Sequence, residues 1–289
     1  MDKENKIIII LILVICFLIG SLINDTSYFF SNETKNKSID PMQDYLIGVI
    51  ACEMPASFNE ESLKSQAIAS RTYAYYLKSK NISLTNDTRT QCSITKEKMK
   101  SIWNENYDTY YNKIKLAVES TKNLVLMYDG NIIPAYYFSM SNGYTENSIS
   151  VFNENYPYLQ SVSSEYEKEN KNFMKTIQIS KQEFCNKLNI LCNEIIISNI
   201  NRNSTNRVES ITINDKNFTG VNIRKILGLR STDFNINVNE NNIDITTYGY
   251  GHGVGMSQTG ANELAKQNKD YKYILSYYYN TQEFSNIYV

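Results

Sequence analysis

Residues 42–80 read MQDYLIGVIACEMPASFNEESLKSQAIASRTYAYYLKSK, and this stretch decides the fold because it predicts two consecutive helices. The first helix is expected over residues 42–54, where large apolar side chains recur at three- and four-residue intervals. Pro55 ends that helix because proline cannot continue the backbone hydrogen-bond pattern. The second helix begins after Asn59, a favourable N-cap residue. Its inward face carries mainly small side chains, which predicts close packing on a neighbouring element.

The pattern changes from helical to β-type after residue 122. Residues 96–122 contain a further helical stretch, whereas residues 124–137 predict a β-hairpin that turns at Asp129-Gly130-Asn131. Further strands are expected at residues 175–179 and 208–213, short helices at 221–227 and 260–267, and a strand or helix at 273–279. This mixture predicts an α+β fold, with one mixed helix and sheet domain over residues 41–289.

Residues 7–23 form the most apolar segment of the chain, and Lys3 and Lys6 precede them. The segment is at the short end of the length that spans a membrane. No small-x-small cleavage site follows, which favours an uncleaved anchor over a cleaved signal peptide. The basic residues place the N-terminus in the cytoplasm. The sequence therefore predicts a cytoplasmic stub and membrane anchor over residues 1–23, a tether over 24–40, and a single-pass protein of the cell membrane whose domain is extracytoplasmic.

The charge and cysteine content exclude two classes of function. With 29 basic and 30 acidic residues, the net charge is −1, and no nucleic-acid partner is expected. The five cysteines follow no metal-binding spacing. Cys52 and Cys92 are isolated in the sequence, whereas Cys185 and Cys192 are close enough to form a disulfide outside the membrane. With a single histidine, a structural zinc site is not expected.

Residues 250–261 read YGHGVGMSQTGA and contain that histidine, His252, together with four of the eleven glycines. Glycine permits positive φ angles and close backbone approach, so this segment is expected to be a shaped functional loop rather than a plain connection. A helix is expected to start near Ser257. A dinucleotide-binding loop is excluded, since no part of the segment fits the G-x-G-x-x-G pattern.

Glu53 is the candidate catalytic carboxylate. It ends an apolar helix, and apolar surroundings raise the pKa of a carboxyl group, as a general acid at neutral pH requires. A solvent-exposed glutamate is the alternative, although at a helix C-terminus it opposes the helix dipole at a cost of about 0.3–1 kcal/mol.

Three segments together resemble the stage II sporulation protein D family, also called the SpoIID/LytB domain. They are residues 44–74, residues 87–91 and residues 249–265, and the first and third are long and specific. The resemblance extends over residues 41–289. Members of the sporulation branch of this family are lytic transglycosylases that act on peptidoglycan glycan strands, and Glu53 matches their catalytic acid.

The resemblance implies a set of substrate-binding residues. His252 and Gln258 are expected to line a glycan-binding groove beside Gly251 and Gly253, and neutral His252 would offer one donor and one acceptor to sugar hydroxyls. Ser257 and Arg71 are weaker candidates, and Arg71 alternatively pairs with a carboxylate of the core. The implied partners are peptidoglycan glycan strands, a cell-wall amidase and membrane proteins of the sporulation engulfment machinery.

The sequence departs from the family at Phe138, where many members have histidine. Some members hold a metal at this loop with cysteine and histidine, and this sequence has neither there, so neither a metal nor another cofactor is expected. Two alternatives stay open. One is a glycoside hydrolase that uses Glu146 or Asp87 as a second carboxylate. The other is a non-catalytic glycan-binding module that activates a partner amidase.

Overall fold

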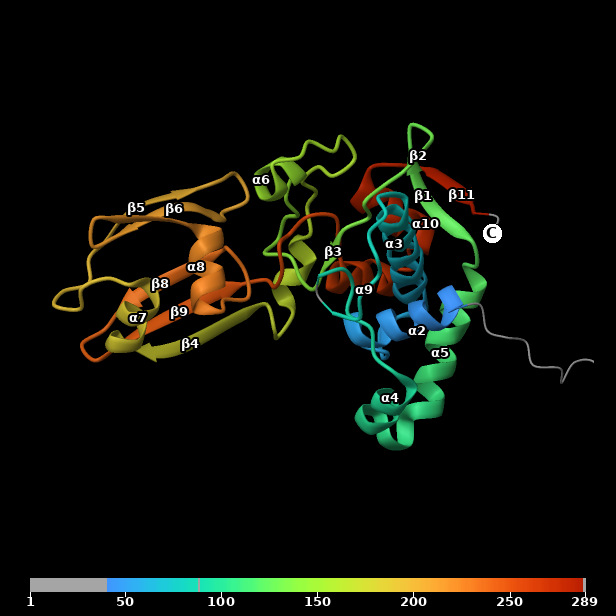
Figure 1. Cartoon of the computed structure of the whole chain (residues 1–289), viewed down its shortest axis with the longest axis horizontal. Helices are drawn as coiled ribbons and strands as arrows, with labels where there is room; N and C mark the ends of the chain where they lie inside the picture. Colours follow the sequence, from blue (N-terminus) through green and yellow to red (C-terminus); the bar gives the residue numbers. More distant parts are fainter. Residues whose placement is uncertain (1–40, 88, 288–289) are drawn as a thin grey trace, which may run out of the picture. The chain divides into compact units, whose positions relative to one another are not determined.

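The computed structural model describes residues 41–87 and 89–287 of the chain (Figure 1). The expected anchor at residues 7–23 and the tether at 24–40 lie outside these residues. Among the helices within the described ranges, none is both long enough and apolar enough to cross a membrane. Met42–Val289 forms one compact unit that contains helices and sheets, so the mixed α+β class expected from the sequence is confirmed.

The two helices predicted from residues 42–80 are present as α2 (Pro41–Glu53) and α3 (Glu60–Ser79). The Asn59 side chain caps α3 by accepting a hydrogen bond from the Glu61 backbone N–H, at 3.0 Å. The next helical stretch divides into α4 (Lys96–Trp103), a 3₁₀ turn η1 (Asn104–Asn106) and α5 (Tyr107–Ser120). Small buried residues of α3 let α5 approach closely, and the helices enclose an apolar core.

The predicted hairpin forms, but it is shorter than expected. β1 (Leu124–Tyr128) pairs antiparallel with β2 (Asn131–Ile132) and, on its other edge, with β11 (Glu283–Asn286). The segment after Pro134 leaves this sheet, and β3 (Tyr137–Phe138) pairs in parallel with β10 (Met256–Ser257). This pairing fixes the segment around Phe138 beside the glycine-rich loop.

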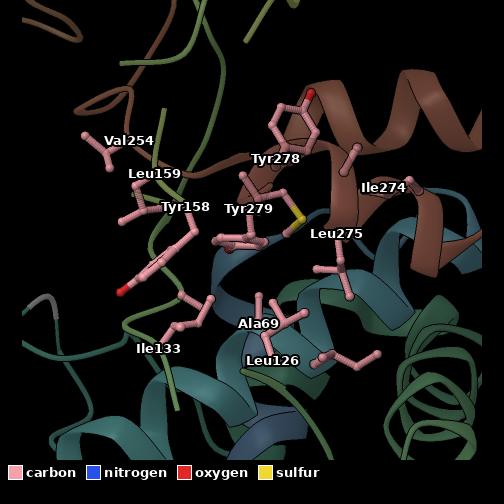
Figure 2. Close-up of a cluster of buried hydrophobic side chains, with 14 of the residues drawn as sticks. Ala69, Leu126, Ile133, Tyr158, Leu159, Val254, Ile274, Leu275, Tyr278 and Tyr279 are labelled. Carbon is pink, nitrogen blue, oxygen red and sulfur yellow. The ribbon is translucent and has the colours of Figure 1, made fainter. Parts of the chain in front are cut away.

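Two helices complete this half of the molecule. They are α9 (Gln258–Lys266) and α10 (Tyr271–Tyr279), so the tyrosine-rich segment left open as strand or helix is a helix. Figure 2 shows the cluster, in which Leu275 and Tyr279 of α10 lie toward Ala69 of α3 and Leu126 of β1. Between β3 and residue 174 the chain forms a short α-helix, α6 (Ser148–Phe152), and a short 3₁₀ helix, η2 (Glu165–Glu169).

Residues 174–248 build a second layered region with its own apolar core. Its strands form two antiparallel sheets in the orders β4-β9-β8 and β5-β6-β7. They are β4 (Met174–Ser180), β5 (Ile197–Arg202), β6 (Val208–Ile213), β7 (Lys216–Thr219), β8 (Phe234–Val238) and β9 (Asn242–Tyr248). α7 (Lys181–Leu188) packs on the first sheet and α8 (Gly220–Leu227) on the second, and the two helices contact each other (Figure 1). The expected Cys185–Cys192 disulfide is present in this region.

Candidate active site

Glu53 is the last residue of α2, and its half-buried carboxyl is held by a neighbouring turn. One carboxyl oxygen accepts a hydrogen bond from the Cys92 backbone N–H at 3.0 Å. A disulfide joins Cys52, the residue before Glu53, to the same Cys92. The interpretation of Cys52 and Cys92 as isolated cysteines is therefore wrong, because two segments 40 residues apart in the chain meet at this carboxyl.

The surroundings of Glu53 raise its pKa. Burial is the largest influence and raises the pKa, while the Cys92 N–H and a side-chain hydrogen bond from Gln258 lower it by stabilising the charged form. Burial prevails, so the carboxyl keeps its proton to higher pH than an exposed glutamate does. This protonation behaviour is the one that a general acid requires.

Glu53 borders two depressions of about 550 and 640 Å³, which share Glu53, Ser139, Tyr250 and Gln258. We call the first the polar arm, since its other lining residues include Asn170, Asn172, Lys175 and Arg230. We call the second the aromatic arm, since its other lining residues include Tyr73, Tyr136, Phe138, Phe152 and His252. The two arms therefore meet at a border to which Glu53 contributes.

His252 lines the aromatic arm, but its ring is tied to the protein itself. Its Nδ1 accepts a hydrogen bond from the Val254 backbone N–H at 3.0 Å, and the ring also bonds to the backbone of Tyr137. Burial, with a smaller contribution from Arg224, lowers its pKa to about 4, so the ring is neutral at neutral pH. The expectation of a free donor and acceptor for sugar hydroxyls is corrected: His252 presents ring surface, packed against Phe138 and Phe152.

The glycines of the loop serve packing within the protein. Gly251 has a φ of +124°, and a Cβ there would lie 2.7 Å from the Cβ of Phe138. Gly251 does line the aromatic arm. Gly253 is buried, with a φ of +89°, and a Cβ there would meet the guanidinium of Arg207 at 2.7 Å. The expected substrate contact at Gly253 is therefore corrected, because the side chains of Arg207 and Glu146 cover this residue.

Ser257 positions the start of α9 instead of facing the groove. Its buried hydroxyl donates to the carboxylate of Glu167 at 2.7 Å and accepts from the Gly260 backbone N–H as the N-cap of α9. Glu167 is itself buried and also accepts bonds from the hydroxyls of Ser141 and Ser164. Because Gln258 is the next residue, this network fixes the side chain that bonds to Glu53.

Arg71 is buried on α3 and is not among the residues that line either arm. Its guanidinium donates to the backbone carbonyls of Val118 and Thr121 at the end of α5 and of Leu124 at the start of β1. The expected substrate contact is thus corrected. Arg71 satisfies carbonyls that the helix end leaves without intrahelical partners.

The two carboxylates considered as a second catalytic group lie outside the groove. Glu146 is buried and forms an ion pair with Arg207, with 3.1 Å between Oε1 and Nη1. Asp87 is exposed and binds the guanidinium of Arg89. Among the described residues that line the two arms, Glu53 is the carboxylate and no second one is present.

Comparison with known proteins places this geometry in a family. The family model described as Stage II sporulation protein matches residues 31–128. The chain is 39% identical over 264 residues to "Stage II sporulation protein D" of Bacillus subtilis (strain 168), which covers 87% of this chain and 77% of that protein. The protein of the same name from Bacillus amyloliquefaciens matches to the same extent.

The chain belongs to the stage II sporulation protein D family.

A shorter stretch of 114 residues is 41% identical to "Amidase enhancer" of Bacillus subtilis and covers 39% of this chain and 14% of that protein. The family resemblance inferred from the sequence is therefore confirmed.

At the position where the chain departs from the family, the residues do not fit a metal. Phe138 packs against the ring of His252, with 5.7 Å between ring centroids. The four cysteines of the described residues are all in disulfides. Within residues 41–87 and 89–287, no group of three or more histidine, cysteine, aspartate or glutamate side chains could hold a metal ion.

Several lining residues were not identified from the sequence. Lys175, Arg224 and Arg230 come from the region of residues 174–248 or the segment that follows α8, far along the chain from Glu53. Tyr250 is part of the glycine-rich segment of residues 250–261. Its position directly before Gly251 was the sequence feature that could have identified it as a lining residue. No local pattern marks the other three, because their role depends on the placement of that region against the groove.

Proposed function

We propose that this protein is a peptidoglycan lytic transglycosylase that cleaves the bond between N-acetylmuramic acid and N-acetylglucosamine. The observation that carries the proposal is that Glu53 supplies the single carboxyl among the described residues that line the two-armed groove, with a pKa raised by burial. A hydrolase of the usual kind needs a second carboxylate. A lytic transglycosylase needs one group, which acts first as acid and then as base.

The reaction follows from these two roles. Protonated Glu53 donates its proton to the glycosidic oxygen as the bond from that oxygen to C1 of the muramyl residue breaks. The resulting carboxylate removes the proton from the muramyl 6-hydroxyl, whose oxygen forms a new bond to C1. The product end is a 1,6-anhydro ring, no water is consumed, and Glu53 is protonated again.

The neighbours of Glu53 support both steps. The Cys92 N–H and Gln258 stabilise the carboxylate that forms after proton donation, so the base is held in place for the second step. Gln258 also bonds to Gln66 at 3.3 Å, which orients its amide. Tyr250 borders both arms and offers a ring face of the kind that packs on sugars.

Product analysis tests the proposal. The protein is incubated with purified glycan strands in water enriched in ¹⁸O, and the new ends are resolved by mass. A lytic transglycosylase gives anhydro-muramyl ends without the label. Labelled reducing ends would instead identify a hydrolase and contradict the mechanism.

Activation of a partner amidase is the second candidate, and the similarity to the amidase enhancer favours it. In this role the groove binds glycan and no bond is cleaved. An amidase assay with the wild-type protein and with Glu53→Gln separates the candidates. Equal stimulation by both proteins, with no anhydro ends from either, would support the binding role alone.

We also propose that the protein acts in cell-wall remodelling during sporulation engulfment, as a single-pass protein of the cell membrane whose domain faces outward. The apolar residues 7–23 after Lys3 and Lys6 support this location. The implied partners are a cell-wall amidase and membrane proteins of the engulfment machinery. Mass measurement of protein extracted from membranes should show the intact N-terminus, whereas a mature chain that begins near residue 24 would indicate secretion.

A further inference from the structure

The charged side chains that line the groove are mostly cationic. Among the described lining residues, Glu53 is the one with a carboxyl group. Four others carry a positive charge, namely Arg89, Lys175, Arg224 and Arg230. The chain as a whole has a net charge of −1. The excess of positive charge is therefore a property of the groove and not of the composition.

Three of these cations form no ion pair with a described carboxylate; Lys175 is exposed, whereas Arg224 and Arg230 are half-buried. Arg89 is compensated by Asp87, whose Oδ2 lies 2.8 Å from Nη2. Arg224 forms no ion pair with any described carboxylate and donates from Nε to the Leu229 carbonyl at 3.4 Å. Arg230 likewise has no ion-pair partner in this part of the chain, and its buried Nε has no hydrogen-bond partner.

One of these guanidinium groups lines each arm, and Tyr250 borders both arms. Arg230 lines the polar arm and stacks on the Tyr250 ring, with 4.8 Å between Cζ and the ring centroid. Arg224 lines the aromatic arm, which Tyr250 also borders. A ligand that occupies both arms therefore meets both positive charges.

A half-buried guanidinium group without an anionic partner costs free energy, because it has lost part of its hydration. Burial lowers the pKa of Arg224, which reflects the loss of water around the charged form. Arginine does not lose its proton in proteins, so an anion that reached these groups would offset the cost that the carbonyl of Leu229 and the ring of Tyr250 leave uncompensated. Glu53 is not that anion, because burial, the Cys92 N–H and Gln258 account for its shifted pKa without either arginine.

We propose that Arg224 and Arg230 bind a carboxylate of the glycan strand and are specificity-determining residues of the groove. The planar fork of a guanidinium matches a carboxylate with two parallel hydrogen bonds. The choice of ligand rests on the proposed function. Peptidoglycan offers carboxylates from two sources, namely the lactyl group of muramic acid where no peptide is attached, and the attached peptide where one is present.

Binding measurements on full-length protein test this inference. Glu53→Gln is used as the background, so that the strands are not cleaved during the measurement. The probes are peptide-free glycan strands, peptide-bearing strands, and neutral N-acetylglucosamine oligosaccharides of similar length. Arg224→Gln and Arg230→Gln are compared with Lys225→Gln, which removes a positive charge from an exposed position of the same helix outside the groove.

Each arginine variant is expected to weaken binding of a carboxylate-bearing probe about tenfold or more, the usual effect of losing a hydrogen bond to a charged group. Binding of the neutral oligosaccharide should change by less than about twofold, as should all binding by Lys225→Gln. Loss confined to peptide-free strands assigns the lactyl carboxylate, and loss confined to peptide-bearing strands assigns the peptide. Arg224→Lys and Arg230→Lys, which keep the charge but lose the planar fork, should recover only part of the affinity that the glutamine variants lose.

Equal weakening on all three probes would overturn the inference, as would unchanged binding in both glutamine variants with a normal melting temperature. These outcomes are separate from the test of the proposed function. The wild-type protein could prefer carboxylate-bearing probes in an arginine-dependent way and still form no anhydro ends. That result would refute the transglycosylase proposal and would support the carboxylate site.

Discussion

Replacing Glu53 by glutamine is the sharpest perturbation of this site. The amide has the size of the carboxyl, and its oxygen can still accept the bond from the Cys92 N–H, which is 3.0 Å in the wild-type protein. What the variant loses is the titratable proton. General acid–base catalysis by a positioned group contributes about 10²–10⁴-fold. At 1.36 kcal/mol for each factor of ten, the barrier should rise by about 2.7–5.4 kcal/mol.

Because Glu53 is proposed to serve both as acid and as base, we expect a loss near the upper end of this range. The assay is the rate at which anhydro-muramyl ends form from glycan strands under single-turnover conditions. Binding of the strands is measured in parallel and should be retained. Glu105→Gln, at an exposed position of η1 outside the groove, controls for the loss of one carboxylate.

Stability provides an independent readout with a defined sign. The pKa of Glu53 is raised in the folded state, so the stabilising contribution of its protonated form is complete below the unfolded pKa. That contribution is lost as the pH rises through the folded pKa. The glutamine variant has no such loss. The difference between its melting temperature and that of the wild type should therefore shift in favour of the variant as the pH rises over this range. Activity within about tenfold of the wild type, or no relative gain in melting temperature, would refute the reasoning.

Three further predictions concern the neighbours of Glu53. Gln258→Leu removes a hydrogen bond that lowers the pKa of Glu53, so the alkaline limb of kcat/KM should move to higher pH; a shift to lower pH would contradict this. His252→Ala should slow turnover by roughly two- to tenfold, from about 0.5–1.5 kcal/mol for the lost aromatic contacts in the aromatic arm, with unchanged products. Its pKa of about 4 also predicts no change in the alkaline limb, and total inactivity in a folded, glycan-binding variant would require histidine in the proton transfer. Activity should survive a chelator, and elemental analysis that finds one zinc per chain would disprove metal independence.

The local elements of the helical half were predictable because their signals are local. Pro55 and Asn59 mark the end of one helix and the start of the next, and both boundaries stand where the sequence places them. Glu53 was identifiable as well, because it ends an apolar helix and matches the catalytic acid of the family. The Cys185–Cys192 pair was identifiable because only a short segment separates the two residues.

The region of residues 174–248 was predicted only in part. β4, β6 and α8 were expected, whereas β5, β7, β8 and β9 were not. In β8 and β9, asparagine, aspartate and threonine fill the exposed positions and weaken the strand signal. These strands form because their alternate apolar residues, such as Phe234 and Ile245, complete a core that exists only in the folded region.

The sequence by itself determined the class of the fold, the family and the carboxyl on which the proposed chemistry depends, because each of these is recorded in short runs of neighbouring residues. The tertiary structure decided which residues surround that carboxyl. The Cys52–Cys92 disulfide, the Ser257–Glu167 network behind Gln258, and the uncompensated Arg224 and Arg230 on the arms that Tyr250 borders all join segments distant in the chain. Burial and charge compensation depend on these contacts between distant segments, so no local sequence pattern could have revealed them.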